Sequence, residues 1–140
     1  MESWPLSLLV RPSLPVRIIR RAGGPPEIVC GAIPSIPFNG ALRDRAVLRQ
    51  SSRPSLGSYA VVAAHLLTFA ALRGRALAVL DMSDIEAFAA ALLGQPFRAA
   101  DGSEVLLPGS RRRRTSDRIL IQVDSMAEQI ERTYGVRLGW

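Results

Sequence analysis

Lysine is absent from the 140-residue sequence, and histidine and cysteine occur once each. Without lysine the chain cannot form a lysine Schiff base or use an ammonium group as a general acid. His65 alone cannot make a histidine pair, and Cys30 alone cannot make an internal disulfide or a cysteine-based zinc site. We therefore expect no catalytic residues, no bound metal and no cofactor. A single cysteine also fits a reducing, cytoplasmic compartment.

Long apolar runs are missing as well. The uninterrupted apolar stretches are much shorter than the roughly 20 residues that a bilayer span needs. The apolar patch near the N-terminus follows Glu2, not a basic residue, and ends at Arg11-Pro12, so a secretory signal is not indicated. With 48% apolar and 21% charged residues, the composition suits one globular domain. We expect no membrane partner.

All 18 basic residues are arginine, and the net charge is +6. Residues 39–53 carry four arginines and one aspartate, and residues 111–118 carry five arginines and one aspartate. Between them, residues 54–110 carry more acidic than basic side chains. This distribution is typical of a helical domain with one phosphate-facing side. The alternative interpretation is that GC-rich coding accounts for the exclusive use of arginine and that these arginines form an ordinary solvated surface.

Residues 1–38 contain seven prolines, which exclude a long helix there. Two β-prone runs, 16–20 and 27–30, flank a Gly-Pro-rich turn and suggest a loose hairpin. From residue 39 the apolar period becomes helical. The predicted fold is all-α: a proline-rich N-terminal extension (1–38), a compact four-helix bundle (39–134) and a C-terminal tail (135–140).

The four predicted helices have recognisable ends. The first, 39–50, starts at Asn39 as N-cap, and the second, 55–73, ends at Gly74. The third, 82–93, starts at the N-cap Asp81, and the last runs from residue 115 or 116 to 134. A long polar connection, 94–114, joins the last two. The predicted inward stripes of the second and last helices are Leu56, Tyr59, Ala63, Leu66, Ala70, Ile119, Val123, Met126 and Ile130.

Two segments carry spacings that resemble a known domain. In residues 55–93, Tyr59 lies four residues after a serine that opens a helix, and Gly74 follows it by fifteen residues. The last helix begins Thr115-Ser116-Asp117-Arg118-Ile119-Leu120, which is similar to a T-x-N-R-x-L pattern. Together these segments resemble the N-terminal core-binding domain of tyrosine recombinases, the phage-integrase family, which has a SAM-like helical fold.

The resemblance implies a DNA-binding module that acts in DNA integration and recombination. Its partners would be double-stranded DNA at a recombination half-site and other recombinase protomers. The chain departs from the family at Asp117, where asparagine is usual, at Met126, where an aromatic residue is usual, and in its long 94–114 connection. The family's catalytic domain would begin where this chain ends, at Trp140. Because the catalytic arginine, lysine, His-x-x-Arg and tyrosine cannot be placed, we expect a module that is not an enzyme.

The predicted DNA-contacting residues lie near two helix starts. Arg111, Arg112, Arg113 and Arg114 precede the last helix, whose N-terminus offers free N–H groups and partial positive charge to a phosphate. Arg53 and Ser55 lie at the start of helix 55–73 in the same way. A charge run in a solvated loop is the alternative interpretation.

On the last helix, Arg118, Gln122, Ser125 and Gln129 share one face that has no acidic residue. Such a face suits a helix in a major groove, where arginine reads guanine and glutamine reads adenine. Arg118 and Gln122, nearer the N-terminus, are the predicted contacts, and an ordinary polar surface is the alternative.

Two other functions stay open on the sequence alone. Alanine-rich helix faces such as Ala60, Ala63 and Ala64 would suit a helical protein-interaction module without a nucleic-acid role. The missing catalytic half and the proline-rich leader would equally suit a nonfunctional remnant of an integrase. No glycine-rich phosphate loop is present, so no small-molecule substrate is expected. His65 fits a half-buried structural role, and Cys30 fits an inert position in a strand.

Overall fold

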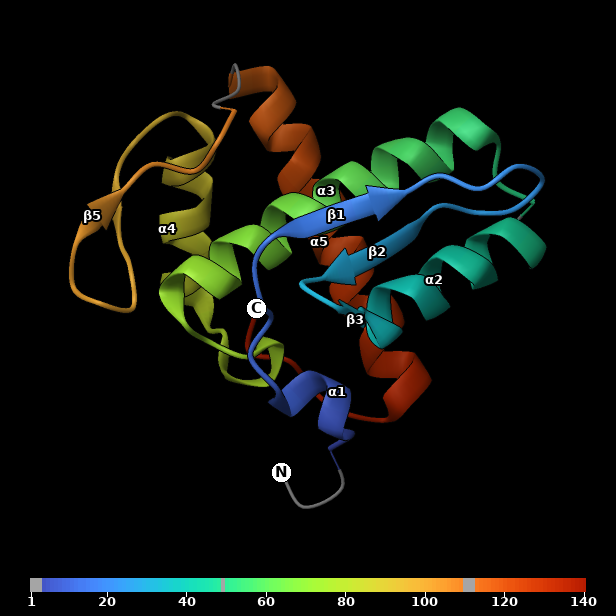
Figure 1. Ribbon diagram of the computed structural model, residues 1–140, viewed down its shortest axis with the longest axis horizontal. Helices are drawn as coiled ribbons and strands as arrows, with labels where there is room; N and C mark the ends of the chain where they lie inside the picture. The colour runs from blue at the N-terminus through green and yellow to red at the C-terminus, as the bar shows by residue number, and fades with distance from the viewer. Residues whose placement is uncertain (1–3, 49, 110–112) are drawn as a thin grey trace.

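The computed structural model describes residues 4–48, 50–109 and 113–140 (Figure 1). Its helices are α1 (Leu6–Leu9), α2 (Ile36–Val47), α3 (Arg53–Arg73), α4 (Met82–Leu92) and α5 (Arg113–Tyr134), with a 3-10 turn at Leu77–Val79. Its strands are β1 (Val16–Ile19), β2 (Glu27–Cys30), β3 (Ile33–Pro34), β4 (Phe97–Arg98) and β5 (Glu104–Val105). The β1–β2 hairpin lies beside α3 and α2, and α4 with the β4–β5 hairpin lies at the other end of the molecule (Figure 1).

The predicted all-α class is wrong, because the fold is mixed α/β with 54% helix and 11% strand. β1 and β2 pair antiparallel from Val16↔Cys30 to Ile19↔Glu27, so the predicted hairpin is present. It is not a loose extension, however. Three consecutive β2 residues, Ile28, Val29 and Cys30, are buried. Prolines exclude a long helix but not short strands, and this central strand is buried on both of its faces.

Asn39 does not cap the first helix, and this prediction is also wrong. α2 begins at Ile36, with Ser35 as the N-cap residue and Pro37 in the first turn, where proline's fixed φ favours a helix start. Asn39 is buried inside α2 and binds the backbone of β2. Its Oδ1 accepts a hydrogen bond from the Ile28 N–H at 2.7 Å, and its Nδ2 donates to the Ile28 carbonyl at 3.0 Å. This amide joins the sheet to the helices.

Replacing Asn39 by alanine is expected to lower the free energy of unfolding by about 2 kcal/mol, because the Ile28 N–H stays buried and loses its acceptor. Urea unfolding followed by circular dichroism measures this change. Gly40→Ala, on the same helix, is the matched control, since an added Cβ meets only the Arg43 side chain at 4.0 Å. It should raise the stability slightly, by up to about 1 kcal/mol. An Asn39→Ala protein as stable as the parent would contradict the role of this amide.

α3 is the central helix of the core, and its predicted apolar stripe is confirmed as buried. By length and hydropathy α3 is the one described helix that could cross a membrane, but half of its apolar window is buried inside the fold. Its contacts with the sheet, α2 and α5 account for that apolarity. Gly74 ends α3 in the left-handed region at φ 69°, as predicted.

α4 starts with a complete capping box, which confirms Asp81 as N-cap. The Asp81 side chain accepts from the Asp84 N–H, and the Asp84 side chain accepts from the Asp81 N–H, both at 3.0 Å. The Ser83 hydroxyl and the Asp84 N–H both donate to Asp81 and hold its pKa below the usual value. Phe88 and Leu92 on this helix are fully buried, and Phe88 packs against Phe69 of α3.

Part of the 94–114 connection forms a second hairpin. β4 and β5 pair through Phe97↔Val105 and Arg98↔Glu104, around a turn in which the Asp101 carboxylate accepts from the Ser103 N–H. Strands of two residues are too short to show an alternating pattern, so the sequence did not predict them. At the other end, residues 135–140 pack back onto the core, where Trp140 Nε1 donates to the Leu77 carbonyl at 2.9 Å. The division at residues 38/39 and 134/135 stays a prediction, although one core includes residues from all three segments.

Candidate nucleic-acid interface

Three arginines from two separate segments surround one small hollow. Arg20 and Arg21 follow β1, and Arg53 opens α3; with Gly57 and residues of the hairpin turn they line a space of about 130 Å³. We call this space the basic hollow. A Cβ at Gly57 would lie 3.5 Å from Arg20 Nη1, so the guanidinium closely approaches the helix at this glycine. The sequence predicted Arg53 but not Arg20 or Arg21, and Gly57, one turn after Arg53, is the only sequence signal for the approach.

The hollow retains positive charge that the fold does not neutralise. Arg21 forms an ion pair with Glu27, with 2.6 Å between Nη2 and Oε2. Arg20 and Arg53 are exposed, and within the described ranges neither has a carboxylate partner. Exposed guanidiniums that lack a carboxylate can bind phosphate oxygens through two parallel hydrogen bonds. Two of the three arginines are therefore available to an external anion.

The start of α3 itself has few backbone donors to offer. Ser52 caps the helix: its Oγ accepts from the Ser55 N–H at 3.4 Å and its carbonyl accepts from the Leu56 N–H at 3.0 Å. Pro54 has no N–H. The Ser55 hydroxyl accepts from the Ser52 hydroxyl at 3.1 Å. The role of Ser55 as a phosphate ligand stays a prediction, and the favourable charge here comes from guanidiniums more than from free N–H groups.

One side of α3 continues the hollow into a longer groove. Val61, Ala64, His65 and Thr68 follow Gly57 at helical spacing and are all half-buried. With β1, Leu14, Pro15 and Pro108 they line a groove of about 500 Å³, which we call the α3–β1 groove. At 1.5 Å per residue, the distance from Arg53 to Thr68 along α3 is about 22 Å. Pro108, at the far end, comes three residues before Arg111 in the sequence.

The arginine tract lies largely outside the described residues. Nothing is described for Arg111 and Arg112, nor for the side chains of Arg113 and Arg114. α5 begins at Arg113, so the last two arginines of the tract belong to the helix instead of preceding it, and the predicted start at residue 115 or 116 is corrected. Arg118 is exposed in the second turn of α5. Gln122 is half-buried, and its Oε1 is buried without a hydrogen-bond partner in the described part of the chain.

The rest of the predicted polar face of α5 is turned toward the protein, so the prediction of a continuous groove-facing stripe is wrong. Gln129 is buried, and its Oε1 accepts from Arg45 Nε at 3.1 Å. The Ser125 hydroxyl accepts from Arg45 Nη2 at 3.0 Å, and the Arg45 guanidinium lies 4.3 Å from the centre of the Tyr59 ring. These contacts hold α2, α3 and α5 together. Only Arg118 and Gln122 remain as candidate contacts on this face.

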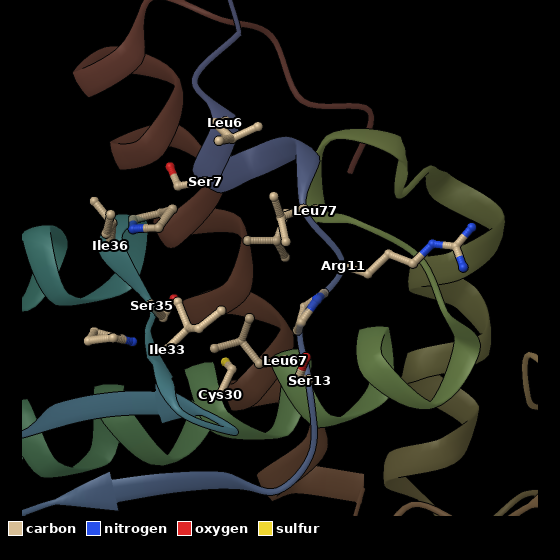
Figure 2. Close-up of a pocket in the computed structure, with 14 residues that line it drawn as sticks. Leu6, Ser7, Arg11, Ser13, Cys30, Ile33, Ser35, Ile36, Leu67 and Leu77 are labelled. Atoms are coloured by element: carbon tan, nitrogen blue, oxygen red, sulfur yellow. The ribbon is translucent and has the colours of Figure 1, made fainter.

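A different cavity, of about 320 Å³, lies between α1, the β2–β3 turn and the start of α2 (Figure 2). Leu67, Leu77 and Cys30 line its inner part, and the exposed Ile33 and Ile36 stand at its rim. The Arg11 guanidinium points away from it (Figure 2). Burial raises the pKa of the Cys30 thiol, which fits the predicted inert role. The lining of this cavity is mostly apolar, so it is not a candidate for phosphate binding.

No group of three or more His, Cys, Asp or Glu side chains within the described ranges could hold a metal ion. No family model, curated protein or solved structure matches the chain. The candidate interface is therefore defined by its own geometry: the basic hollow, the α3–β1 groove beside it, and the exposed start of α5.

Proposed function

We propose that this chain is a DNA-binding module that holds duplex DNA through its phosphates and does not itself cut or join it. The observation that carries the proposal is the basic hollow, where Arg20 and Arg53 come together from separate segments without a carboxylate partner in the described part of the chain. A fold gains no stability from placing like charges together, so such a pair is best explained by an anionic ligand.

The dimensions favour a polymer over a single small anion. Along α3, Arg53 in the hollow lies about 22 Å from Thr68 in the groove. DNA presents one phosphate per about 1.7 Å of duplex axis, so a duplex along this side would offer phosphates at both ends. The arginine tract follows Pro108 in the sequence and would add further cations there. Phosphate contacts of this kind position a protein on DNA without reading its sequence.

The resemblance to the core-binding domain of tyrosine recombinases supports the same proposal. In that role the chain would bind one side of a recombination half-site, in the cytoplasm, beside other recombinase protomers. The predicted contacts would be Arg53, Ser55, the tract Arg111–Arg114, Arg118 and Gln122, to which the hollow adds Arg20. The catalytic residues of that family have no counterpart among the described side chains, so DNA cleavage is not proposed for this chain.

The test is binding of a fluorescein-labelled 20-base-pair duplex, measured by anisotropy at 50 mM salt. A double variant, Arg20→Gln with Arg53→Gln, should bind at least ten-fold more weakly, because two charge-assisted phosphate contacts are lost.

The matched control is Arg132→Gln with Arg137→Gln, which removes the same charge from a hollow that also contains Glu128 and Glu131. We expect its affinity to stay within three-fold of the parent. Equal weakening of both double variants would mean that only net charge matters, and the hollow would not be a site.

A further inference from the structure

The outer strand of the larger sheet has a free edge. The sheet order is β1-β2-β3, so one side of β1 has no partner strand in the described structure. The Pro15 carbonyl accepts from the Gly31 N–H at 2.9 Å, on the β2 side. Alternate residues of an antiparallel strand direct their backbone groups to the same side, so Arg17 and Ile19 face β2 as well. Val16 and Ile18 therefore present their N–H and C=O groups to the free edge.

The α3–β1 groove lies directly beside this edge. Val16 and Ile18 line it from the strand, and Val61, Ala64 and Thr68 line it from α3. Exposure alternates along β1, with Val16 and Ile18 half-buried and the two residues that alternate with them exposed. An added strand would have the same alternation, with every second side chain directed into the groove. The groove of about 500 Å³ is lined mostly by aliphatic side chains, with His65 and Thr68 among them, and would accept aliphatic side chains there.

The opposite face of the strand is positive. Arg17 is exposed, and its Nη2 donates to the Gly31 carbonyl at 3.3 Å. Among the described residues, Arg17 has no carboxylate partner. An added strand with acidic side chains on this face would be favoured. A second copy of β1 would be disfavoured, because it would bring the arginines of both copies together.

We propose that the free edge of β1 binds an extended segment of a partner protein in which aliphatic and acidic residues alternate. The backbone groups of Val16 and Ile18 supply the affinity by strand addition, the groove selects the aliphatic side chains, and Arg17 selects the acidic ones. This activity goes beyond DNA binding and does not depend on it. Since the groove borders the basic hollow, such a segment would compete with duplex DNA for this side of the molecule.

The probe is a fluorescein-labelled seven-residue peptide that alternates valine and glutamate, titrated with the full chain in the absence of DNA. In an antiparallel addition the valines lie opposite Val16 and Ile18, so their amides face β1. N-methylation of the valine amides should weaken binding at least ten-fold, whereas N-methylation of the glutamate amides should leave it within three-fold. Ala64→Phe, which fills the groove from α3, should also weaken binding at least ten-fold.

Two results would overturn the proposal. Equal affinity of the two methylated peptides, or no binding by any peptide, would show that the backbone edge is not used. A parent chain that is dimeric in light scattering, and becomes monomeric in the Ala64→Phe variant, would assign the edge to a second copy instead. The circular dichroism spectrum and urea unfolding of Ala64→Phe show whether the variant is folded. Duplex binding by the unmodified chain, measured separately, tests DNA binding independently of the peptide.

Discussion

Replacing Asp84 by asparagine is expected to lower the free energy of unfolding by about 3 kcal/mol, one of the two largest effects expected in this protein. Asp84 is almost fully buried at the start of α4 and pairs with Arg73, the last residue of α3, and with Arg75, which follows the C-cap Gly74. Arg73 Nε lies 2.9 Å from its Oδ1, and Arg75 Nε lies 3.0 Å from its Oδ2. An asparagine keeps the shape but leaves Arg73 without its counter-charge and Arg75 with only the Asp81 carboxylate, at 4.0 Å. Urea unfolding followed by circular dichroism measures the loss.

Glu86→Gln is the control for Asp84→Asn, because Glu86 is an exposed carboxylate on the same helix. Its effect should stay within about 0.5 kcal/mol. Both arginines are partly exposed, so solvent screens their ion pairs with Asp84. We therefore expect a loss of stability at the lower end of the range for breaking a buried ion pair. If the two variants unfolded at the same urea concentration, the Asp84 cluster would not join α3 to α4.

The second large effect concerns the arginine tract. Replacement of all four arginines, Arg111–Arg114, by glutamine should weaken binding of the 20-base-pair duplex about a hundred-fold at 100 mM salt, since four phosphate contacts are lost. The loss should be similar for duplexes of unrelated sequence, because phosphate contacts do not distinguish bases. Competition titrations with two unlabelled duplexes measure both quantities.

A stability measurement on the four-arginine variant distinguishes a loss of DNA contacts from a folding defect. The tract contributes no residue to the described hydrophobic core, so the free energy of unfolding should change by less than about 1 kcal/mol. A variant that folds normally and binds DNA as tightly as the parent would mean that the tract is only a solvated charge run.

The long helices could be predicted from the sequence because their signals are local. α3, α4 and the end of α5 follow the apolar period, and Gly74 and the capping pair at Asp81 lie where the sequence places them. α3 begins at Arg53, two residues before the predicted start, because Ser52 is its N-cap. α5 starts earlier than expected because arginine is a good helix former and nothing in the tract prevents a helix.

The errors concern contacts between segments far apart in the chain. The amide of Asn39 pairs with the β2 backbone, which turns a proline-rich leader into part of the core. Arg45 of α2 donates to Ser125 and Gln129 of α5 and turns both side chains toward the protein. A polar side chain at a helical spacing gives no sign of which of these roles it has, because the partner is set by tertiary packing.

The candidate site shows the same difference between local sequence signals and contacts between distant segments. Arg53 at a helix start was a local signal, but the approach of Arg20 depends on the hairpin folding back against Gly57. A charge count along the chain places residues 1–38 outside the two basic segments. The fold brings an arginine of that leader into the basic hollow.

The most direct test of the central claim, that arginines from separate segments bind one duplex, is the salt dependence of DNA binding by the unmodified chain. If Arg20, Arg53 and the four arginines of the tract neutralise about six phosphates, log K should fall with log salt at a slope near −5. The slope should become less steep by about 2 in the Arg20→Gln, Arg53→Gln protein. A slope near zero, or no duplex binding at 50 mM salt, would contradict the account.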